Sequence, residues 1–299
     1  MDSKNSLVDL TKYYGRMELL GEDCIDLLDR LSTNDVSVLR HPGQGLSSVL
    51  TTNKGRIIDL LGLFLFEDKF LLVSSSDSIR RVSEWIEFYT IMEDVTQIDV
   101  SDKTFQIRIF SDDSRGIFPE INNCKTDNFF ISNLAEAKVT IISNKMNQKI
   151  CLDVIGDLSD KKRIIEFLKN SGTQLESNQF ENIRISLGFP KFGTELTEEF
   201  NPLEAGLIDH ISFNKGCYIG QEVVARLNTY DKVQRKLVKL SWDGLLEGNE
   251  IFSGGKVVGV ITSNVEGVGL GFVRNNFANL ESELTCGEKS LHVTEVLSD

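Results

Sequence analysis

The apolar pattern of this chain changes at Arg235. Before that residue, β-rich runs alternate with segments whose apolar residues recur at helical spacing, and this alternation occurs in two similar blocks. After it, short β-branched runs follow one another, separated by Gly-, Asn- and Ser-containing turns. The pattern predicts an α+β fold with two subdomains, followed by a small C-terminal β-barrel.

The domain boundaries follow from the same change. We place the α+β region at residues 1–234 and the barrel at residues 235–299. Within the α+β region, the first subdomain takes about residues 1–115 with part of 180–234, and the second takes about 116–180. A chain of 299 residues with 40% hydrophobic content is long enough for this division.

Turn and cap residues delimit the elements of the first block. Asn53, Lys54 and Gly55 separate two β-rich runs, Leu46–Thr52 and Arg56–Phe66, which predicts a hairpin because asparagine and glycine tolerate positive φ. Asp23 and Asp77 are then expected to cap the two helices of this block, since each precedes apolar residues at helical spacing.

The second block contains strands, a helix stop and one irregular stretch. Strands are expected near Val139–Ser143 and Ile150–Ile155, and a helix over Asn178–Leu187 is stopped by Gly188. Residues Ile117–Lys138 have no clean period and carry several turn-forming residues, so they are predicted to be mostly an irregular surface excursion.

Charge and cysteine usage exclude several classes of protein. Lys and Arg total 32 against 45 Asp and Glu, which gives a net charge of −13 and argues against a nucleic-acid partner. The five cysteines show no C-x-x-C spacing, and their odd number favours a reducing compartment over a disulfide framework. We expect no permanent metal.

The cellular location is predicted from the N-terminal residues and from the longest apolar run. Residues Met1–Leu7 contain neither an apolar core nor an arginine-rich amphipathic stretch, so we expect no signal or transit peptide. The apolar run Ile57–Phe66 is far shorter than the roughly 20 residues of a membrane-spanning helix. The chain is therefore expected to be a cytoplasmic protein of bacterial type with no membrane partner, and to be a monomer.

One segment, Phe213–Arg226, carries recognisable chemistry. Gly216 and Gly220 bracket Cys217, so the thiol is expected on a tight bend leading into a helix that begins near Gly220. The positive end of that helix and the nearby Lys215 would both favour a thiolate. Cys217, with Lys215 beside it, is therefore the candidate reactive or ligand-forming group; the alternative is a small buried hydrophobe.

Two pairs of residues in and near this segment give no specific evidence for catalysis. Glu222 and Arg226 are four residues apart and are consistent with an ordinary intrahelical ion pair. His210 lies seven residues before Cys217, but no third group that would orient such a nucleophile pair is evident.

Residues Lys215–Glu222 match the signature K-G-C-Y-x-G-Q-E at every specified position, and the chain thereby resembles the YgfZ family of the glycine-cleavage T-protein (aminomethyltransferase) superfamily. Four further stretches resemble that superfamily in collinear order: Met17–Val36, Thr52–Asp59, Phe200–Leu207 and Gly254–Ser263. The resemblance therefore covers nearly the whole chain.

The resemblance implies a fold and a function. The fold is a T-protein-like ring of two α+β subdomains, of the ferredoxin-like or split kind, and a β-barrel around a tetrahydrofolate site. The function is that of a tetrahydrofolate-binding accessory protein for assembly or repair of iron–sulfur ([4Fe-4S]) proteins through Cys217, which would contact a cluster only transiently. Iron–sulfur apoproteins or cluster carriers would be the partners. The alternative is a folate-dependent aminomethyl or one-carbon transferase.

The resemblance also assigns folate-binding residues, namely Asn53, Asp59, Arg184, Tyr218, Gln221, Glu222 and Arg226. Two departures from the transferase pattern weaken the alternative function. Leu60 follows Asp59 where transferases carry a second acid, and Ser186 occupies the place of the glutamate that holds the pterin. Asp59 could instead be a buried carboxylate paired with Arg56 or Lys54, and Arg184 a helix-surface charge.

Overall fold

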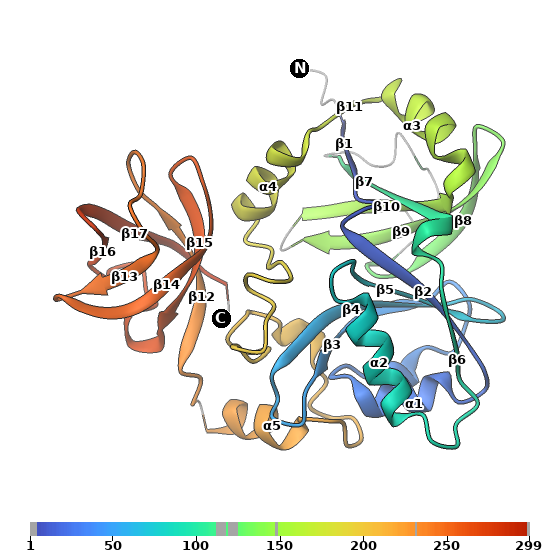
Figure 1. Cartoon of the computed structure of the whole chain (residues 1–299), viewed down its shortest axis with the longest axis horizontal. Coiled ribbons are helices and arrows are strands. Elements are labelled where there is room, and N and C mark those ends of the chain that lie inside the picture. The colour runs from blue at the N-terminus through green and yellow to red at the C-terminus, as the bar shows by residue number, and fades with distance from the viewer. Residues whose placement is uncertain (1–4, 112–117, 119–124, 147–148, 231, 298–299) are drawn as a thin grey trace.

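The computed structural model describes residues 5–111, 118, 125–146, 149–230 and 232–297. Its strands form two sheets and a closed barrel, with the barrel on one side of the stacked sheets (Figure 1). The predicted class, α+β with a C-terminal β-barrel, is confirmed. Along the described ranges, no helix combines the length and apolarity that crossing a membrane requires.

The first sheet has the strand order β3-β4-β5-β2-β6, with antiparallel pairing at every neighbour. Its elements are β2 (Tyr14–Leu20), α1 (Cys24–Leu31), β3 (Gly45–Thr51), β4 (Ile57–Leu65), β5 (Phe70–Ser75), α2 (Ile79–Tyr89) and β6 (Thr96–Asp99). Both helices cover one face, where Leu28 and Ile86 share a core with Leu61 of β4. The hairpin predicted around Gly55 is confirmed as β3 and β4.

The second sheet has the order β11-β1-β7-β10-β9-β8. Its elements are β1 (Asn5–Asp9), β7 (Thr104–Phe110), β8 (Phe129–Leu134), β9 (Ala137–Met146), β10 (Lys149–Asp157), α3 (Lys161–Lys169) and β11 (Gly172–Gln174). Helix α3 buries Ile164 and Leu168 against one face. On the other face, helix α4 (Ser177–Ser186) contributes Phe180 to a cluster with Val8 and Phe110.

The structure corrects the predicted subdomain boundary. Strands β1 and β7 lie in the second sheet, although residues 1–115 were assigned to the first subdomain. Strand β1 lies in the second sheet, and β2 to β6 form the first sheet. The chain returns to the second sheet at β7, which pairs with both β1 and β10. Local apolar period cannot reveal such a crossing, since it reports a strand and not its neighbour.

Two smaller expectations are also wrong. Strands β8 and β9 occupy residues 129–134 and 137–138 of the stretch predicted to be irregular, while residues 117 and 119–124 of the same stretch lie outside the described residues. The residue at the start of α2 is Ser78, not Asp77, and its hydroxyl does not cap the helix. That hydroxyl donates instead to Asp59, and its oxygen also lies 3.0 Å from the carbonyl oxygen of Ser75.

The barrel is closed by six strands in the order β12-β15-β14-β13-β16-β17. They are β12 (Arg235–Ser241), β13 (Glu250–Ser253), β14 (Lys256–Val265), β15 (Val268–Arg274), β16 (Leu284–Cys286) and β17 (Lys289–Val296). Leu237, Leu270 and Phe272 pack outside the barrel's own core, together with Val49 and Ile57 of the first sheet.

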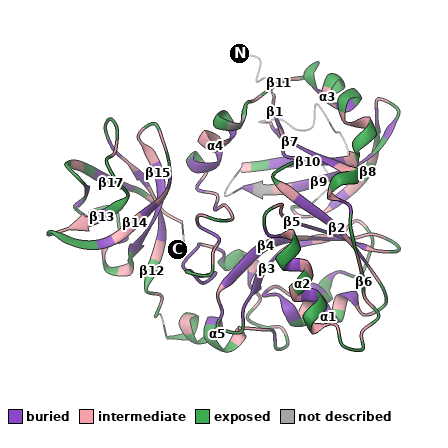
Figure 2. Ribbon diagram, in the orientation of Figure 1, coloured by how far each residue is buried: buried purple, intermediate pink, exposed green. Residues whose placement is uncertain are grey.

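A long connection between α4 and α5 (Gln221–Thr229) lies between the barrel and the first sheet (Figure 1). Figure 2 shows that buried residues follow this connection as well as the strands of both sheets. Phe200 of the connection stacks on Phe272 of the barrel, with 3.5 Å between the ring centroids. The barrel and the α+β region therefore share one apolar interface.

Candidate functional site

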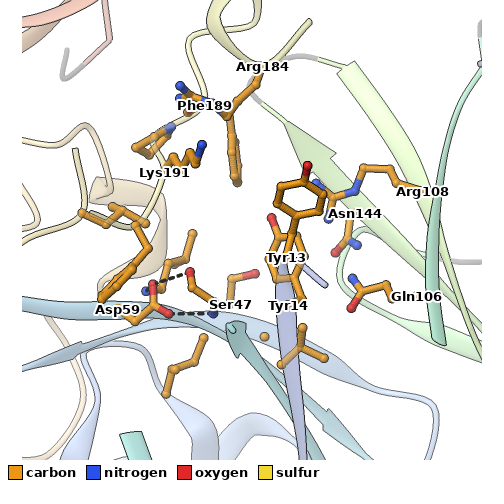
Figure 3. A pocket seen from close by; sticks show the side chains of 18 of the residues that line it. Tyr13, Tyr14, Ser47, Asp59, Gln106, Arg108, Asn144, Arg184, Phe189 and Lys191 are labelled. Atoms are coloured by element: carbon orange, nitrogen blue, oxygen red, sulfur yellow. Dashed lines mark hydrogen bonds between the residues drawn. The ribbon is translucent and has the colours of Figure 1, made fainter. Parts of the chain in front are cut away.

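A cavity lies where the two sheets, helix α4 and the start of the long connection meet (Figure 3). Its walls combine apolar and aromatic side chains with polar and charged ones. The polar and aromatic side chains that line it include Tyr13, Tyr14, Ser47, Asp59, Ser75, Asp77, Gln106, Arg108, Asn144, Glu181, Arg184, Phe189 and Lys191.

Asp59 of β4 is fully buried at the cavity. Its carboxylate accepts hydrogen bonds from the backbone N–H of Ser75 at 2.8 Å, the hydroxyl of Ser75 at 3.3 Å and the hydroxyl of Ser78. Burial raises the pKa of Asp59, and these donors offset part of that effect. The expected partners were Arg56 or Lys54; the structure provides serines instead.

The acceptor capacity of Asp59 is already filled within the protein. One oxygen accepts from Leu60 N–H at 2.8 Å and from the Ser75 hydroxyl, and the other accepts from Ser75 N–H and the Ser78 hydroxyl. A carboxylate offers about four lone-pair sites. The Ser75 hydroxyl makes the longest of these bonds, so a ligand donor reaches Asp59 most readily by replacing it.

Across the cavity, a buried ion pair is centred on Asp153 of β10. Arg108 donates through Nε to Oδ1 at 2.6 Å and through Nη2 to Oδ2 at 2.7 Å. Gln106 Nε2 and Asn144 Nδ2 donate to the same Oδ2 at 2.8 and 2.7 Å. The guanidinium also lies 5.5 Å from the ring centre of Tyr14. These contacts hold the cavity-lining side chains in fixed orientations.

One consequence of this network is that the side-chain oxygen of Gln106 lacks a hydrogen-bond donor among the described residues. Because Gln106 Nε2 is committed to Asp153, the amide orientation is set, and its Oε1 is buried without a hydrogen-bond partner among the described residues. A buried unsatisfied acceptor costs about 1–3 kcal/mol. Gln106 itself is among the residues that line the cavity (Figure 3).

Arg184 is buried rather than on the helix surface, which corrects the simpler interpretation of this residue. Its guanidinium donates to Glu181 through Nε and Nη2 at 3.1 and 3.0 Å, to the Phe189 carbonyl at 2.6 Å and to Ser263 Oγ at 2.8 Å. Partial burial tends to raise the pKa of Glu181, but Arg184 and Lys191 bring it below its ordinary value.

Arg184 also belongs to a buried network with Glu195, which is completely inaccessible to solvent. The Glu195 carboxylate accepts from Arg184 Nη1 at 3.3 Å, from Lys191 N–H at 3.0 Å, and from the hydroxyls of Thr262 and Ser263 at 2.5 and 2.7 Å. This network links α4, the long connection and the barrel behind the cavity.

Glu181 is a cavity residue that the sequence interpretation missed. The resemblance placed the family's glutamate position at Ser186, but Ser186 is exposed and does not line the cavity. Glu181 lies five residues earlier on α4, lines the cavity, and pairs through its carboxylate with Arg184 and Lys191. The i,i+3 spacing of Glu181 and Arg184 on a predicted helix was the available signal.

The signature segment lies elsewhere, against the end of helix α1. Lys215 is almost completely buried, and its ammonium contacts the carbonyls of Asp29, Asn34 and Ser32 at 2.5, 2.6 and 3.1 Å and the Asp29 carboxylate at 2.8 Å. Burial lowers the pKa of Lys215, and Asp29 partly opposes this. Lys215 thus anchors the segment.

Cys217 follows this anchor and is exposed, so the alternative of a buried hydrophobe is wrong. Helix α5 begins at Gln221, after Gly220 with φ of 87°, as predicted. A side chain at Gly220 would approach the carbonyl oxygen of Thr52 to 2.5 Å, so glycine is required there. The other cysteines in the described residues, Cys24, Cys151 and Cys286, are buried.

The structure divides the predicted folate-binding residues into two groups. Asp59 and Arg184 line the cavity. The other five do not: they lie at the β3–β4 hairpin tip or in the signature segment and α5, and they are Asn53, Tyr218, Gln221, Glu222 and Arg226. Among them Tyr218 is buried, which raises its pKa to about 12, while Asn53, Glu222 and Arg226 are exposed.

Together, two stacked sheets with covering helices, a cavity between the sheets and a β-barrel beside them define a protein of the T-protein fold. The crystal structure of glycine cleavage system aminomethyltransferase T from Bartonella henselae superposes with a TM-score of 0.85 at 18% identity, covering 99% of this chain and 87% of that one. Residues 2–155 match the family described as GCVT N-terminal domain, and residues 234–296 match CAF17, C-terminal beta-barrel domain. The chain belongs to the YgfZ/CAF17 family.

Individual relatives are distant but span most of the chain. A chloroplastic Arabidopsis thaliana protein, At1g60990, which carries a provisional transferase name, is 29% identical over 94% of this chain and 68% of its own length. The aminomethyltransferase of Halothermothrix orenii is 24% identical over 94% of this chain and 84% of its own length. That of Halalkalibacterium halodurans is 23% identical over 94% and 82%.

Proposed function

We propose that this protein binds tetrahydrofolate in the cavity and supports the assembly or repair of iron–sulfur proteins through Cys217. The observation that carries the proposal is the separation of two chemistries. The cavity holds the fixed polar groups, whereas the exposed thiol lies outside it on an anchored segment that a partner protein can reach. A transferase would need its reactive groups inside the cavity.

The cavity suits a reduced pterin. A pterin is a flat ring with several N–H donors, and the cavity offers the free Gln106 Oε1 and the Asp59 carboxylate as acceptors, with Phe189 and Tyr13 as aromatic walls. When bound, tetrahydrofolate supplies a carrier for one-carbon groups. The residues of this chain would orient it and exclude water around it.

A test of the whole proposal begins with a gene deletion in the host or a tractable relative. Activities of several [4Fe-4S] enzymes and the flux through glycine cleavage are measured in the same extracts. Loss of the cluster enzymes with glycine cleavage intact supports the proposal. Intact cluster enzymes with lost one-carbon flux would instead establish the transferase alternative.

That alternative, a folate-dependent aminomethyl or one-carbon transferase, is favoured by one observation. Asp59 is a cavity carboxylate whose pKa is raised by burial, and such a group can exchange a proton with a bound amine. Against it, the next residue, Leu60, carries no second acid.

Asp59→Asn should weaken tetrahydrofolate binding by about tenfold to hundredfold, because a hydrogen bond to a charged group contributes about 1.5–3 kcal/mol. Isothermal titration calorimetry measures the change. Ser75→Ala is the matched control: it removes the 3.3 Å bond and frees a lone pair on Asp59, so affinity should hold or rise. Equal affinity in Asp59→Asn and wild type would remove Asp59 from the binding site.

Gln106→Met should lower tetrahydrofolate affinity by about 5- to 20-fold, since it removes the free acceptor while keeping side-chain volume. The same variant loses the 2.8 Å bond to Asp153. Asn144→Leu also loses a bond to Asp153, of 2.7 Å, and so controls for that effect. Equal affinity losses in the two variants would mean that the effect passes through Asp153 rather than through Oε1.

A further inference from the structure

A second polar site lies on the barrel. Arg235 begins β12 and Arg274 ends β15, and the two are direct cross-strand partners. Such partners have Cβ atoms about 4.5–5.5 Å apart on the same face. Both arginines line two adjoining surface hollows; one of these also includes Lys232, and none of the residues that line either hollow carries a carboxylate.

This arrangement is unfavourable in the protein alone. Like charges directly opposite one another on a sheet are destabilising, and here they occur in a chain of net charge −13, where carboxylates are plentiful. The described carboxylate that Arg235 influences is Glu204, which is buried and already 3.7 Å from Arg56. Within the described part of the chain, the positive charges of Arg235, Arg274 and Lys232 are therefore not balanced by an equal number of nearby carboxylates.

Arg235 is exposed and also lies over an aromatic ring. Its guanidinium carbon lies 5.7 Å from the ring centre of Phe200, which itself stacks on Phe272. An arginine held against an aromatic ring loses less conformational freedom when it binds an anion. The amide side chains of Gln234, Asn275 and Asn276 complete the hollow that holds Lys232 and add further donors.

We propose that Arg235 and Arg274 form a binding site for a compact, multiply charged oxyanion, either a phosphate ester or a polycarboxylate. Two guanidinium groups present paired N–H donors that match the oxygens of either class. Binding would relieve the repulsion between the two arginines. The site is independent of the cavity and of the proposed folate binding, because the two share no lining residue.

The test is thermal unfolding of the full chain with pyrophosphate or tricarballylate, compared with NaCl at the same ionic strength. At least one of the two anions should raise the melting temperature in a saturable manner and beyond the effect of NaCl. The stronger of the two identifies the class. In Arg235→Gln/Arg274→Gln, the apparent affinity should fall at least about tenfold, and without anion this variant should melt no lower than wild type.

A matched control removes the same charge elsewhere. Lys162→Gln/Lys169→Gln takes two exposed cations from α3, at the opposite end of the molecule, and should respond to the anions as wild type does (Figure 1). An anion effect no larger than that of NaCl overturns the proposal. So does equal stabilisation of the arginine double variant and wild type.

Discussion

Replacing Cys217 by serine should leave the protein folded and able to bind tetrahydrofolate, yet abolish its support for [4Fe-4S] enzymes in a deletion strain. The thiol is exposed, so the substitution disturbs no core packing. It lies on a segment whose position is set by Lys215, and that anchor is unchanged. A hydroxyl does not replace a thiolate as a ligand or nucleophile. The measurement is the activity of several cluster enzymes in complemented strains.

Asn214→Ala provides the comparison for this variant. Asn214 is an exposed neighbour in the same segment, and its loss should leave enzyme activities at the wild-type level. Tetrahydrofolate titrations of purified Cys217→Ser should match wild type, because Cys217 does not line the cavity. Full complementation by Cys217→Ser would refute a chemical role for this thiol and with it the proposed function.

Arg108→Met should lower the free energy of unfolding by about 3–5 kcal/mol, because removing one partner of a buried ion pair leaves an uncompensated charge. Arg108 and Asp153 are 5% and 2% exposed. After the substitution, Asp153 keeps only the amide donors of Gln106 and Asn144 among the side-chain contacts described above. Urea unfolding of the purified proteins measures the difference.

Two comparisons make this prediction specific. Arg108→Met/Asp153→Leu removes both charges and should recover much of the lost stability, since an apolar pair can replace a buried ion pair. Arg163→Met breaks an exposed pair with Asp160 and should cost at most about 1 kcal/mol. A loss in Arg108→Met no larger than that in Arg163→Met would mean that the buried pair is not needed for stability.

The elements that sequence could predict are those with strong local signals. The hairpin at Gly55, the helix end at Gly188 and the start of α5 after Gly220 each depend on a residue that tolerates positive φ, and φ is positive at all three. The barrel was evident because β-branched runs follow one another there with no helical period between them. These features are encoded within a few residues of where they occur.

What sequence could not predict depends on contacts between distant residues. Arg108 and Asp153 are separated by 45 positions and meet because β7 pairs with β10. The free acceptor on Gln106 exists only because that pair orients its amide. Asp59 lines the same cavity as Gln106 and Arg108, whereas the family resemblance had assigned it to one site with residues of the signature segment. Strand pairing, which no local period specifies, decides all three outcomes.

The contacts between the barrel and the rest of the chain limit how freely this protein could be recombined with its relatives. Residues 234–296 match a domain family of their own, which suggests an exchangeable module. Yet Phe272 completes a stack with Phe200, and Ser263 satisfies both Arg184 and Glu195. A chimera with the barrel of a relative would keep these contacts only if it also took the residues that Phe272 and Ser263 contact. The barrel and the connection beside the cavity are therefore expected to be exchanged together.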